Sequence, residues 1–222
     1  MVVDLGAGTG KLTRALSASG ARVIAIEPLP EMRAILAAKA PGAELLDGTA
    51  EELPLESGSI DALSVGQAFH WFDAERALAE IARVLRPRGS LALIWNVRDL
   101  SDPLQVALQE LLAGYRRSAP SEHERPWRAS IASSQHFGRG ERRSFDWVLP
   151  HTVSELADRI ASVSFVAALE EDEREALLAL VRALVAGVAE PFPFRYRTEV
   201  YIYPREGERP GRGSAANGVA PR

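Results

Sequence analysis

The sequence contains no cysteine among its 222 residues, which excludes a disulfide framework, a thiolate nucleophile and a cysteine-based zinc site. Its four histidines are scattered along the chain and form no ligand cluster, so we expect no bound metal. No secretory leader is recognisable, and no apolar run approaches the roughly 20 residues that a membrane span needs. These absences favour a cytoplasmic location.

Positive charge is also scarce, because 26 lysines and arginines face 30 aspartates and glutamates and leave a formal net charge of -4. The chain therefore lacks the general positive field that draws proteins to nucleic acid or to an anionic membrane, and we expect neither partner. A content of 46% hydrophobic and 25% charged residues is typical of an ordinary globular domain. We expect a small-molecule substrate, and the sequence does not indicate an oligomeric state.

The first hundred residues alternate between short apolar runs and segments with helical spacing of their apolar residues. The pattern predicts strands at 1–5, 22–26, 43–46, 60–65 and 90–95, with helices at 11–19 and 73–85. Pro30 marks the first position of a further helix, Asp73 caps the helix at 73–85, and residues 86–89 form a turn. Five parallel strands joined by helices predict an α/β, doubly wound, Rossmann-like sheet that binds its ligand at the carboxyl ends of the strands.

After residue 98 the pattern changes. Helices are expected from Asp102 and Pro103, from a capping box of Thr152 and Glu155, and from the acidic residues 170–173; strands are expected at 145–149 and 195–203. A polar stretch between them is rich in arginine, and we interpret most of its guanidinium groups as solvated and one or two as able to bind a carboxylate. These arginines are Arg116, Arg117, Arg125, Arg128, Arg139, Arg142 and Arg143. From residue 205 onward, composition predicts a disordered tail.

The strongest motif is the glycine loop that follows the first strand. Gly6, Gly8 and Gly10 alternate directly after Asp4 and Leu5, and a helix is expected to open at the end of the loop. Glycines allow a tight turn and a close approach of the backbone to a ligand, while the free NH groups of the helix favour an anionic group. Since three alternating glycines follow a strand, an ordinary β-α turn is the weaker interpretation.

Particular residues disfavour the two phosphate-binding versions of this loop. A dinucleotide fingerprint needs a third glycine where Lys11 stands, and a P-loop needs glycine at Leu5 and serine or threonine at Leu12. The remaining ligand has a carboxylate near the helix start and a ribose beyond it, without a pyrophosphate. Glu27 closes the second strand, where its carboxylate can accept hydrogen bonds from both ribose hydroxyls; the alternative is a solvated strand-end cap.

These residues resemble the class I S-adenosylmethionine-dependent methyltransferases, specifically the type 11 group. The resemblance is carried by Asp4-Leu5-Gly6-Ala7-Gly8-Thr9-Gly10, Glu27, Gly48-Thr49-Ala50-Glu51-Glu52-Leu53-Pro54, Gln67-Ala68-Phe69-His70-Trp71-Phe72-Asp73 and Trp95-Asn96. It implies a mostly parallel seven-stranded sheet with an antiparallel last strand and helical cap insertions. It also implies a cofactor-binding core at 1–98, a cap with the final strands at 99–204 and a tail at 205–222. Beyond residue 98, the likeness is to trans-aconitate-type small-molecule methyltransferases.

Matching positions imply the cofactor site. Asp4 and Gly6 would hold the amino group of S-adenosylmethionine, Glu27 its ribose, and Thr49 with Ala50 the edge of its adenine. Gln67 would make a backbone contact near the sulfonium, and Ala7, Gly8 and Gly10 complete the loop. Many members of the family have aspartate where Thr49 stands, so adenine recognition here would depend on the hydroxyl or on the Ala50 NH.

The acceptor side follows the fourth strand. His70 is the candidate catalytic residue, because an imidazole could orient or deprotonate a nucleophile near neutral pH; the alternative is a hydrogen-bonded structural histidine. Trp71 and Phe72 could provide a cation-π wall for the sulfonium or could simply pack beneath the next helix. We expect Trp71, Trp95 and Asn96 to contact the substrate, which would be O-methylated on a carboxylate or hydroxyl.

Other functions compete with methyl transfer. A nicotinamide-dependent oxidoreductase shares the strand, loop and helix but is disfavoured by Lys11, and a cofactor-binding protein without catalysis stays open. Base methylation is less favoured, since no Asn-Pro-Pro-aromatic signature follows strand four. In the family, a helix before the first strand covers the cofactor, whereas Met1 lies within that strand. We therefore expect an open cofactor cleft and an exposed apolar patch. We also expect weak cofactor binding, which should improve when the chain is extended upstream.

Overall fold

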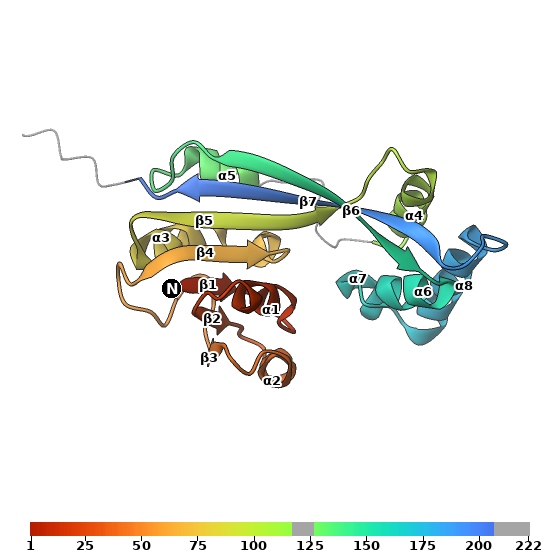
Figure 1. Cartoon of the computed structure of the whole chain (residues 1–222), viewed down its shortest axis with the longest axis horizontal. Coiled ribbons are helices and arrows are strands. Elements are labelled where there is room, and N and C mark those ends of the chain that lie inside the picture. Colours follow the sequence, from red (N-terminus) through yellow and green to blue (C-terminus); the bar gives the residue numbers. More distant parts are fainter. Residues whose placement is uncertain (117–126, 207–222) are drawn as a thin grey trace, which may run out of the picture. The chain divides into compact units, whose positions relative to one another are not determined.

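The computed structural model describes residues 1–116 and 127–206, and Figure 1 shows the arrangement of the elements. The strands are β1 (Val2–Leu5), β2 (Val23–Ile26), β3 (Glu44–Leu46), β4 (Ile60–Gly66), β5 (Leu85–Val97), β6 (Glu141–His151) and β7 (Phe192–Pro204). The helices are α1 (Lys11–Ala18), α2 (Pro30–Lys39), η1 (Phe69–Trp71, a 3₁₀ turn), α3 (Ala74–Val84), α4 (Pro103–Ala113), α5 (Trp127–Ser133), α6 (Val153–Ala161), α7 (Ser164–Ala167) and α8 (Glu171–Leu184).

All seven strands belong to one sheet, in the order β3-β2-β1-β4-β5-β7-β6. Strand β1 pairs in parallel with β2 and with β4, and β2 pairs in parallel with β3. All four residues of β2 are buried, as parallel strands covered on both faces require. In Figure 1 the arrow of β7 runs against that of β5. The predicted doubly wound α/β fold, with an antiparallel last strand, is therefore confirmed.

The chain forms two compact units. Unit 1 contains Met1–Ala92, Trp127–Glu141 and, among the described residues, 202–206. Unit 2 contains Arg142–Tyr201 and, among the described residues, 93–116. Strands β5, β6 and β7 thus have residues in both units. The expected division at residue 98 stays a prediction.

Local sequence signals set the helix starts as predicted. Pro30 is the first residue of α2, where its missing NH costs nothing. The Asp73 side chain accepts a hydrogen bond from the Arg76 NH and caps α3, and Asp102 caps α4 in the same manner through the Leu104 NH. Thr152 and Glu155 form the full capping box of α6.

Three segments differ from the predictions. Strand β5 begins at Leu85 and therefore includes the expected turn at 86–89, although Arg88 in it has a φ of 68°. Strand β6 extends well beyond 145–149, because its ladder with β7 continues through polar residues. Helix α5 lies in the arginine-rich stretch that the sequence left without structure, and it buries Trp127 and Ile131 one turn apart.

Unit 2 has its own hydrophobic core. Helices α4, α6 and α8 contribute residues such as Leu108, Leu156 and Leu177, which pack with Phe194 and Tyr196 of β7. No helix in residues 1–116 and 127–206 is long and apolar enough to cross a membrane. The expected tail is described only at Arg205 and Glu206, whose backbone NH groups donate to Gly89 and His136; residues 207–222 lie outside the described residues.

Candidate functional site

The glycine loop between β1 and α1 has the left-handed backbone that its sequence predicts. Gly6, Gly8 and Gly10 have φ values of 67°, 56° and 82°. A Cβ on Gly6 would lie 2.8 Å from Cβ of Ala68, and a Cβ on Gly10 would collide with the Leu36 side chain, so packing alone requires glycine at both. Around Gly8 no atom lies within 4 Å of such a Cβ. The backbone at Gly8 therefore faces open space, as a ligand-binding loop requires.

Asp4 lies at the end of β1 with only 1% of its surface exposed. Its Oδ2 accepts a hydrogen bond from the Thr13 hydroxyl of α1 at 2.6 Å, whereas its buried Oδ1 accepts none from the described residues. Burial raises the pKa of Asp4 to about 6, against the lowering effect of the Thr13 hydrogen bonds. A buried acceptor without a partner is costly, and a ligand ammonium would satisfy it.

Glu27, directly after β2, is 6% exposed. Its Oε2 accepts the Gly8 NH at 2.8 Å, and its Oε1 accepts the Leu29 NH at 3.1 Å. The carboxylate therefore serves as a strand-end cap, and it also connects the end of β2 to the glycine loop. Each carboxylate oxygen has a second acceptor site, so these two bonds leave capacity for ribose hydroxyls.

Arg33 of α2 is a residue that the sequence reasoning missed. Its Nη1 donates to the carbonyl oxygens of Glu27 at 2.6 Å and Pro28 at 2.8 Å, and both terminal nitrogens contact the Asp47 carboxylate, at 2.9 and 3.1 Å. Arg33 thereby joins the ends of β2 and β3, which carry Glu27 and the segment leading to Thr49. An arginine three residues beyond the start of a short helix gave no recognisable signal.

The segment that includes Thr49 and Ala50 is held against α3. Thr49 is exposed and the Ala50 side chain is buried, which leaves the Thr49 hydroxyl as the accessible group of the pair. The Leu53 NH donates to Glu80 of α3 at 3.0 Å, and Arg83 donates to the Leu53 carbonyl at 3.0 Å. These contacts hold the segment that follows Ala50 against α3.

The segment after β4 contains Gln67 and His70. Gln67 is exposed and has a φ of 57°, a conformation that few residues other than glycine adopt without a structural cause. His70 is partly buried, and burial lowers the pKa of its imidazole below the ordinary value. The neutral imidazole is therefore favoured at neutral pH, which is the form able to accept a proton.

Trp71 and Phe72, for which packing and ligand contact were equal alternatives, have different environments. Trp71 is 60% exposed, and its ring lies 4.7 Å from that of His70 between centroids. The Phe72 ring packs edge-on against Phe69 and would be 3.4 Å from a Cβ on Gly6. Phe72 therefore packs against the glycine loop at Gly6, and Trp71 presents an accessible aromatic face.

The other two expected substrate residues, Trp95 and Asn96, belong to unit 2 and are described within it. Trp95 is 3% exposed, so its side chain is part of the core. The Asn96 Oδ1 accepts the Thr198 hydroxyl at 2.7 Å, and the same hydroxyl oxygen accepts the Trp147 indole NH at 3.0 Å. Trp95 and Asn96 therefore lie in the part of β5 that belongs to unit 2, whereas the other candidate residues belong to unit 1.

The arginines of the arginine-rich stretch have different environments. Arg117 and Arg125 lie outside the described residues. Arg142 pairs with Glu199 at 2.9 Å, and Arg116 lies over the Phe165 ring. Arg128 and Arg139 line a cavity.

The geometry of unit 1 fits an S-adenosylmethionine cofactor. The Asp4 Oδ1 is a buried acceptor without a partner among the described residues, the backbone at Gly8 is open, and Glu27 is connected to the same loop. All three follow the carboxyl ends of β1 or β2, where doubly wound sheets bind ligands. An ammonium, a compact ligand backbone and a ribose diol are the groups that these residues suit.

Comparison with known proteins supports the same conclusion. The sequence profile of a methyltransferase domain, type 11, matches residues 3–93. An uncharacterized methyltransferase of Mycobacterium tuberculosis is 40% identical over 185 residues, which are 83% of this chain and 73% of the relative. A malonyl-[acyl-carrier protein] O-methyltransferase of Methylococcus capsulatus is 40% identical over 97 residues, 41% of this chain and 35% of the relative.

Among solved structures, a putative type II methyltransferase from Anaeromyxobacter dehalogenans has the same fold, with a TM-score of 0.64 and 21% identity over 91% of this chain and 88% of that one. The fold, the glycine loop and these relatives agree. This chain belongs to the class I S-adenosylmethionine-dependent methyltransferases and is an enzyme of that family.

Proposed function

We propose that this methyltransferase binds S-adenosylmethionine at the carboxyl ends of β1, β2 and β4 and transfers the methyl group to an oxygen atom of a small molecule. The observation that carries the proposal is the buried Asp4 Oδ1, which has no partner among the described residues. The ammonium group of S-adenosylmethionine would supply a charge-assisted hydrogen bond there. Gly6, Ala7, Gly8 and Gly10 would follow the methionine part of the cofactor.

Glu27 would hold the ribose, and Thr49 with Ala50 would contact the adenine edge. The existing bonds from Gly8 and Leu29 fix the Glu27 carboxylate before any ligand arrives, so little side-chain entropy is lost on binding. Gln67, with its strained backbone, would present a main-chain group toward the sulfonium. Trp71 is exposed enough to offer its ring to the positive charge.

S-adenosylmethionine supplies an activated methyl group when bound, so the protein mainly aligns the acceptor and excludes water. His70 would act on the acceptor. A hydroxyl acceptor would transfer its proton to the neutral imidazole as the new O–CH₃ bond forms, whereas a carboxylate acceptor has no proton to lose and His70 would only orient it. The substrate contacts expected of Trp95 and Asn96 stay a prediction.

Oxygen as the acceptor atom is supported by chemistry and by a relative. His70 is the one candidate base, and it suits a hydroxyl, while a carboxylate needs none. The Methylococcus capsulatus relative is an O-methyltransferase. The trans-aconitate-type likeness and the expected absence of nucleic acid and membrane partners stay predictions.

The test is a transfer assay with S-adenosylmethionine labelled in its methyl group and a protein-free ultrafiltrate of cell extract as the source of acceptors. Methyl esters release labelled methanol in alkali, whereas methyl ethers and methylamines keep the label. We expect low-molecular-weight products that are esters or ethers. Label found only in amines, or no transfer at all, would contradict the proposal.

A further inference from the structure

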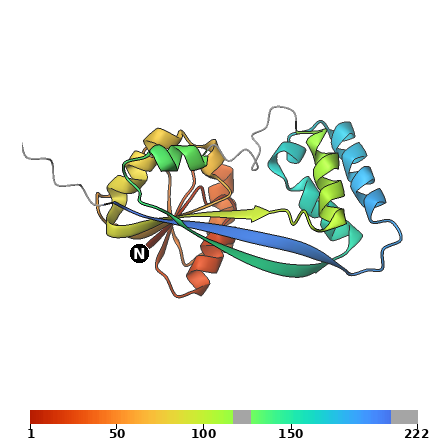
Figure 2. The ribbon, with the colours of Figure 1, turned by 90° about the horizontal axis from the view of Figure 1, so that it is seen from above.

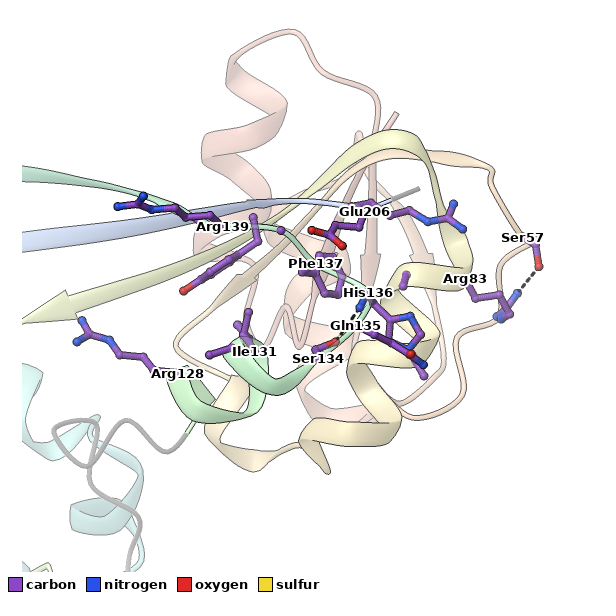
Figure 3. A pocket seen from close by; sticks show the side chains of 17 residues that line it. Ser57, Arg83, Arg128, Ile131, Ser134, Gln135, His136, Phe137, Arg139 and Glu206 are labelled. Carbon is purple, nitrogen blue, oxygen red and sulfur yellow. Dashed lines mark hydrogen bonds between the residues drawn. The ribbon is translucent and has the colours of Figure 1, made fainter. Parts of the chain in front are cut away.

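A cavity of unit 1 lies away from the glycine loop. It has a volume of about 1310 Å³ and is shown in Figure 3. Its walls come from α3, α5, the segment 134–140 and the end of β7. Ser57 and Arg83 lie at one end of the cavity, and Arg128 and Arg139 extend toward the opposite end (Figure 3). A cavity of this size accommodates an organic ligand rather than a single ion.

Backbone pairing builds the walls. Phe137 and Arg205 form an antiparallel bridge, the Gly138 NH donates to Pro204, and the Glu206 NH donates to His136. Helix α5 packs beside α3, as Figure 2 also shows. Ile131 and Phe137 are almost fully buried and give the cavity an apolar floor. The cavity is therefore part of the folded unit, with fixed main-chain walls.

Positive charge dominates the lining. Four arginines line the cavity, and Glu206 is the one carboxylate among the lining residues. Arg83 is neutralised by Glu80, its partner at 2.7 Å, and Arg205 donates to the Leu85 carbonyl, which carries no charge. This excess of positive charge occurs in a chain whose net charge is -4.

Several polar side chains of the lining have capacity for a ligand. The guanidinium of Arg139 is exposed and makes no hydrogen bond or ion pair with residues 1–116 or 127–206. The ring of His136 and the amide of Gln135 likewise make no hydrogen bond with the described part of the chain. In Figure 3, His136 and Gln135 lie near the end that contains Arg83. The cavity thus has a cationic end, an apolar floor and a neutral polar end.

We propose that this cavity binds an organic anion with an apolar body, whose carboxylate pairs with Arg139. A guanidinium can bind a carboxylate through two parallel hydrogen bonds, which gives direction as well as attraction. The apolar body would cover Ile131 and Phe137. Gly140 contributes indirectly: a Cβ there would collide with the Tyr203 ring, so glycine allows that ring to lie against the backbone and form the wall.

The site is separate from the cofactor residues. Asp4, Glu27 and Gln67 follow the carboxyl ends of parallel strands, whereas Ser57 precedes β4, and Arg83 lies in the last turn of α3 just before β5 begins. The cavity therefore lies at the amino ends of the parallel strands, opposite the cofactor residues. Its ligand is not the methyl donor.

A matched pair of probes tests the proposal. 4-Phenylbutyrate has an aromatic body and a carboxylate, and 4-phenylbutyramide differs from it only by replacing the charge with a neutral amide. Binding to the full chain is followed by saturation-transfer NMR and by backbone amide shifts. We expect the carboxylate to bind about tenfold more tightly than the amide and to shift the amides of residues 134–140.

Arg139→Gln should lower the affinity for 4-phenylbutyrate about tenfold and leave the affinity for 4-phenylbutyramide unchanged. Arg14→Gln is the matched control, since Arg14 is also an exposed arginine, on α1. Ala132→Trp, which adds bulk at an exposed lining position, should weaken both probes. Melting temperatures near that of the wild type show that the variants fold.

Three results would overturn the proposal: no detectable binding of the carboxylate, equal binding of carboxylate and amide, or equal loss in Arg139→Gln and Arg14→Gln. Displacement of the probe by S-adenosylhomocysteine would also overturn it, because the probe would then lie at the glycine loop. None of these results argues against a cofactor at the glycine loop, so failure here leaves the proposed function standing.

Discussion

The Gly8 NH donates to the Glu27 Oε2 at 2.8 Å, and this side-chain hydrogen bond joins the loop after β1 to the end of β2, where the Gly6 and Ala7 NH groups also donate to the Ile26 carbonyl. The same carboxylate accepts the Leu29 NH. Glu27 therefore shapes the cofactor loop as well as offering acceptor sites to a ribose. A change at Glu27 should affect both the loop and the affinity for the cofactor.

Glu27→Gln should lower the affinity for S-adenosylhomocysteine at least about tenfold, because a hydrogen bond to a charged acceptor contributes roughly 1.5 to 3 kcal/mol. The amide keeps one acceptor oxygen but replaces the other by a donor. Glu44→Gln, at an exposed glutamate of β3, is the control. Calorimetric titration of both variants checks the prediction, and equal affinity in the two would remove Glu27 from the site.

Cofactor binding should depend on pH through Asp4, whose pKa burial raises to about 6. Only the ionised carboxylate pairs with an ammonium, so affinity should fall by about tenfold per pH unit below this value. Asp4→Asn should bind weakly at every pH. His70→Gln is the control for a second titrating group and should keep the pH profile of the wild type. A flat wild-type affinity profile between pH 7 and about pH 5 would contradict the assignment.

The raised pKa of Asp4 also predicts that ionisation of this carboxyl group, which favours cofactor binding, lowers the stability of the fold. A raised pKa means that the folded state binds the proton more tightly, so this contribution to stability is fully present below 3.8 and is lost as pH rises through about 6. Asp4→Asn removes the charge from the buried site. Its free energy of unfolding should therefore exceed that of the wild type at pH 8, by up to about 3 kcal/mol. Denaturant titration at pH 8 and at pH 4 measures the difference, which should shrink at the lower pH.

His70→Gln should reduce turnover far more than cofactor affinity, since the residue is proposed to act on the acceptor. For a hydroxyl acceptor the loss should be about 10² to 10⁴, the range of general-base catalysis. Because burial lowers the pKa of His70, the acid limb of the wild-type profile should lie below the ordinary imidazole value of 6.5. Losses of activity that merely follow losses of melting temperature would instead indicate a structural histidine.

Arg33→Lys should weaken cofactor binding by about threefold to tenfold, although no ligand contact is proposed for Arg33. Lysine keeps the charge but cannot contact the Asp47 carboxylate and the carbonyls of Glu27 and Pro28 together. Arg22→Lys is the control, because the Arg22 pair with Glu44 is exposed and 3.5 Å long. Similar affinities in the two variants would show that Arg33 has no positioning role.

The sequence predicted the first hundred residues well because their signals are local. The turns of the glycine loop, the Pro30 start and the Asp73 cap depend on a few neighbouring residues, and each was found in place. The role of Arg33 depends on Asp47 and on the carbonyls of the two residues that follow β2, which no local pattern encodes. Trp71 and Phe72 have equivalent sequence signals, and only the packing of Phe72 beside Gly6 separates them.

Beyond residue 98 the signals are weaker for a physical reason. Helix α5 has seven residues in a polar stretch, and its stability comes from burying Trp127 and Ile131 rather than from propensity. The spacing of those two residues was the one available signal. Strand β6 is exposed along most of its length, so it lacks the alternation by which half-buried strands are recognised.

The most direct measurement of the central claim compares two glycines that differ in their surroundings. Gly8 and Gly20 both have positive φ, of 56° and 83°, and neither has an atom within 4 Å of an added Cβ. Alanine should therefore strain the backbone similarly at both, but only at Gly8 would the methyl group enter the space proposed for the cofactor. In calorimetric titrations with S-adenosylhomocysteine, Gly8→Ala should lose at least about tenfold in affinity while Gly20→Ala binds as the wild type does. Wild-type affinity in Gly8→Ala, with Gly20→Ala equally unaffected, would contradict the assignment of the glycine loop as the cofactor site.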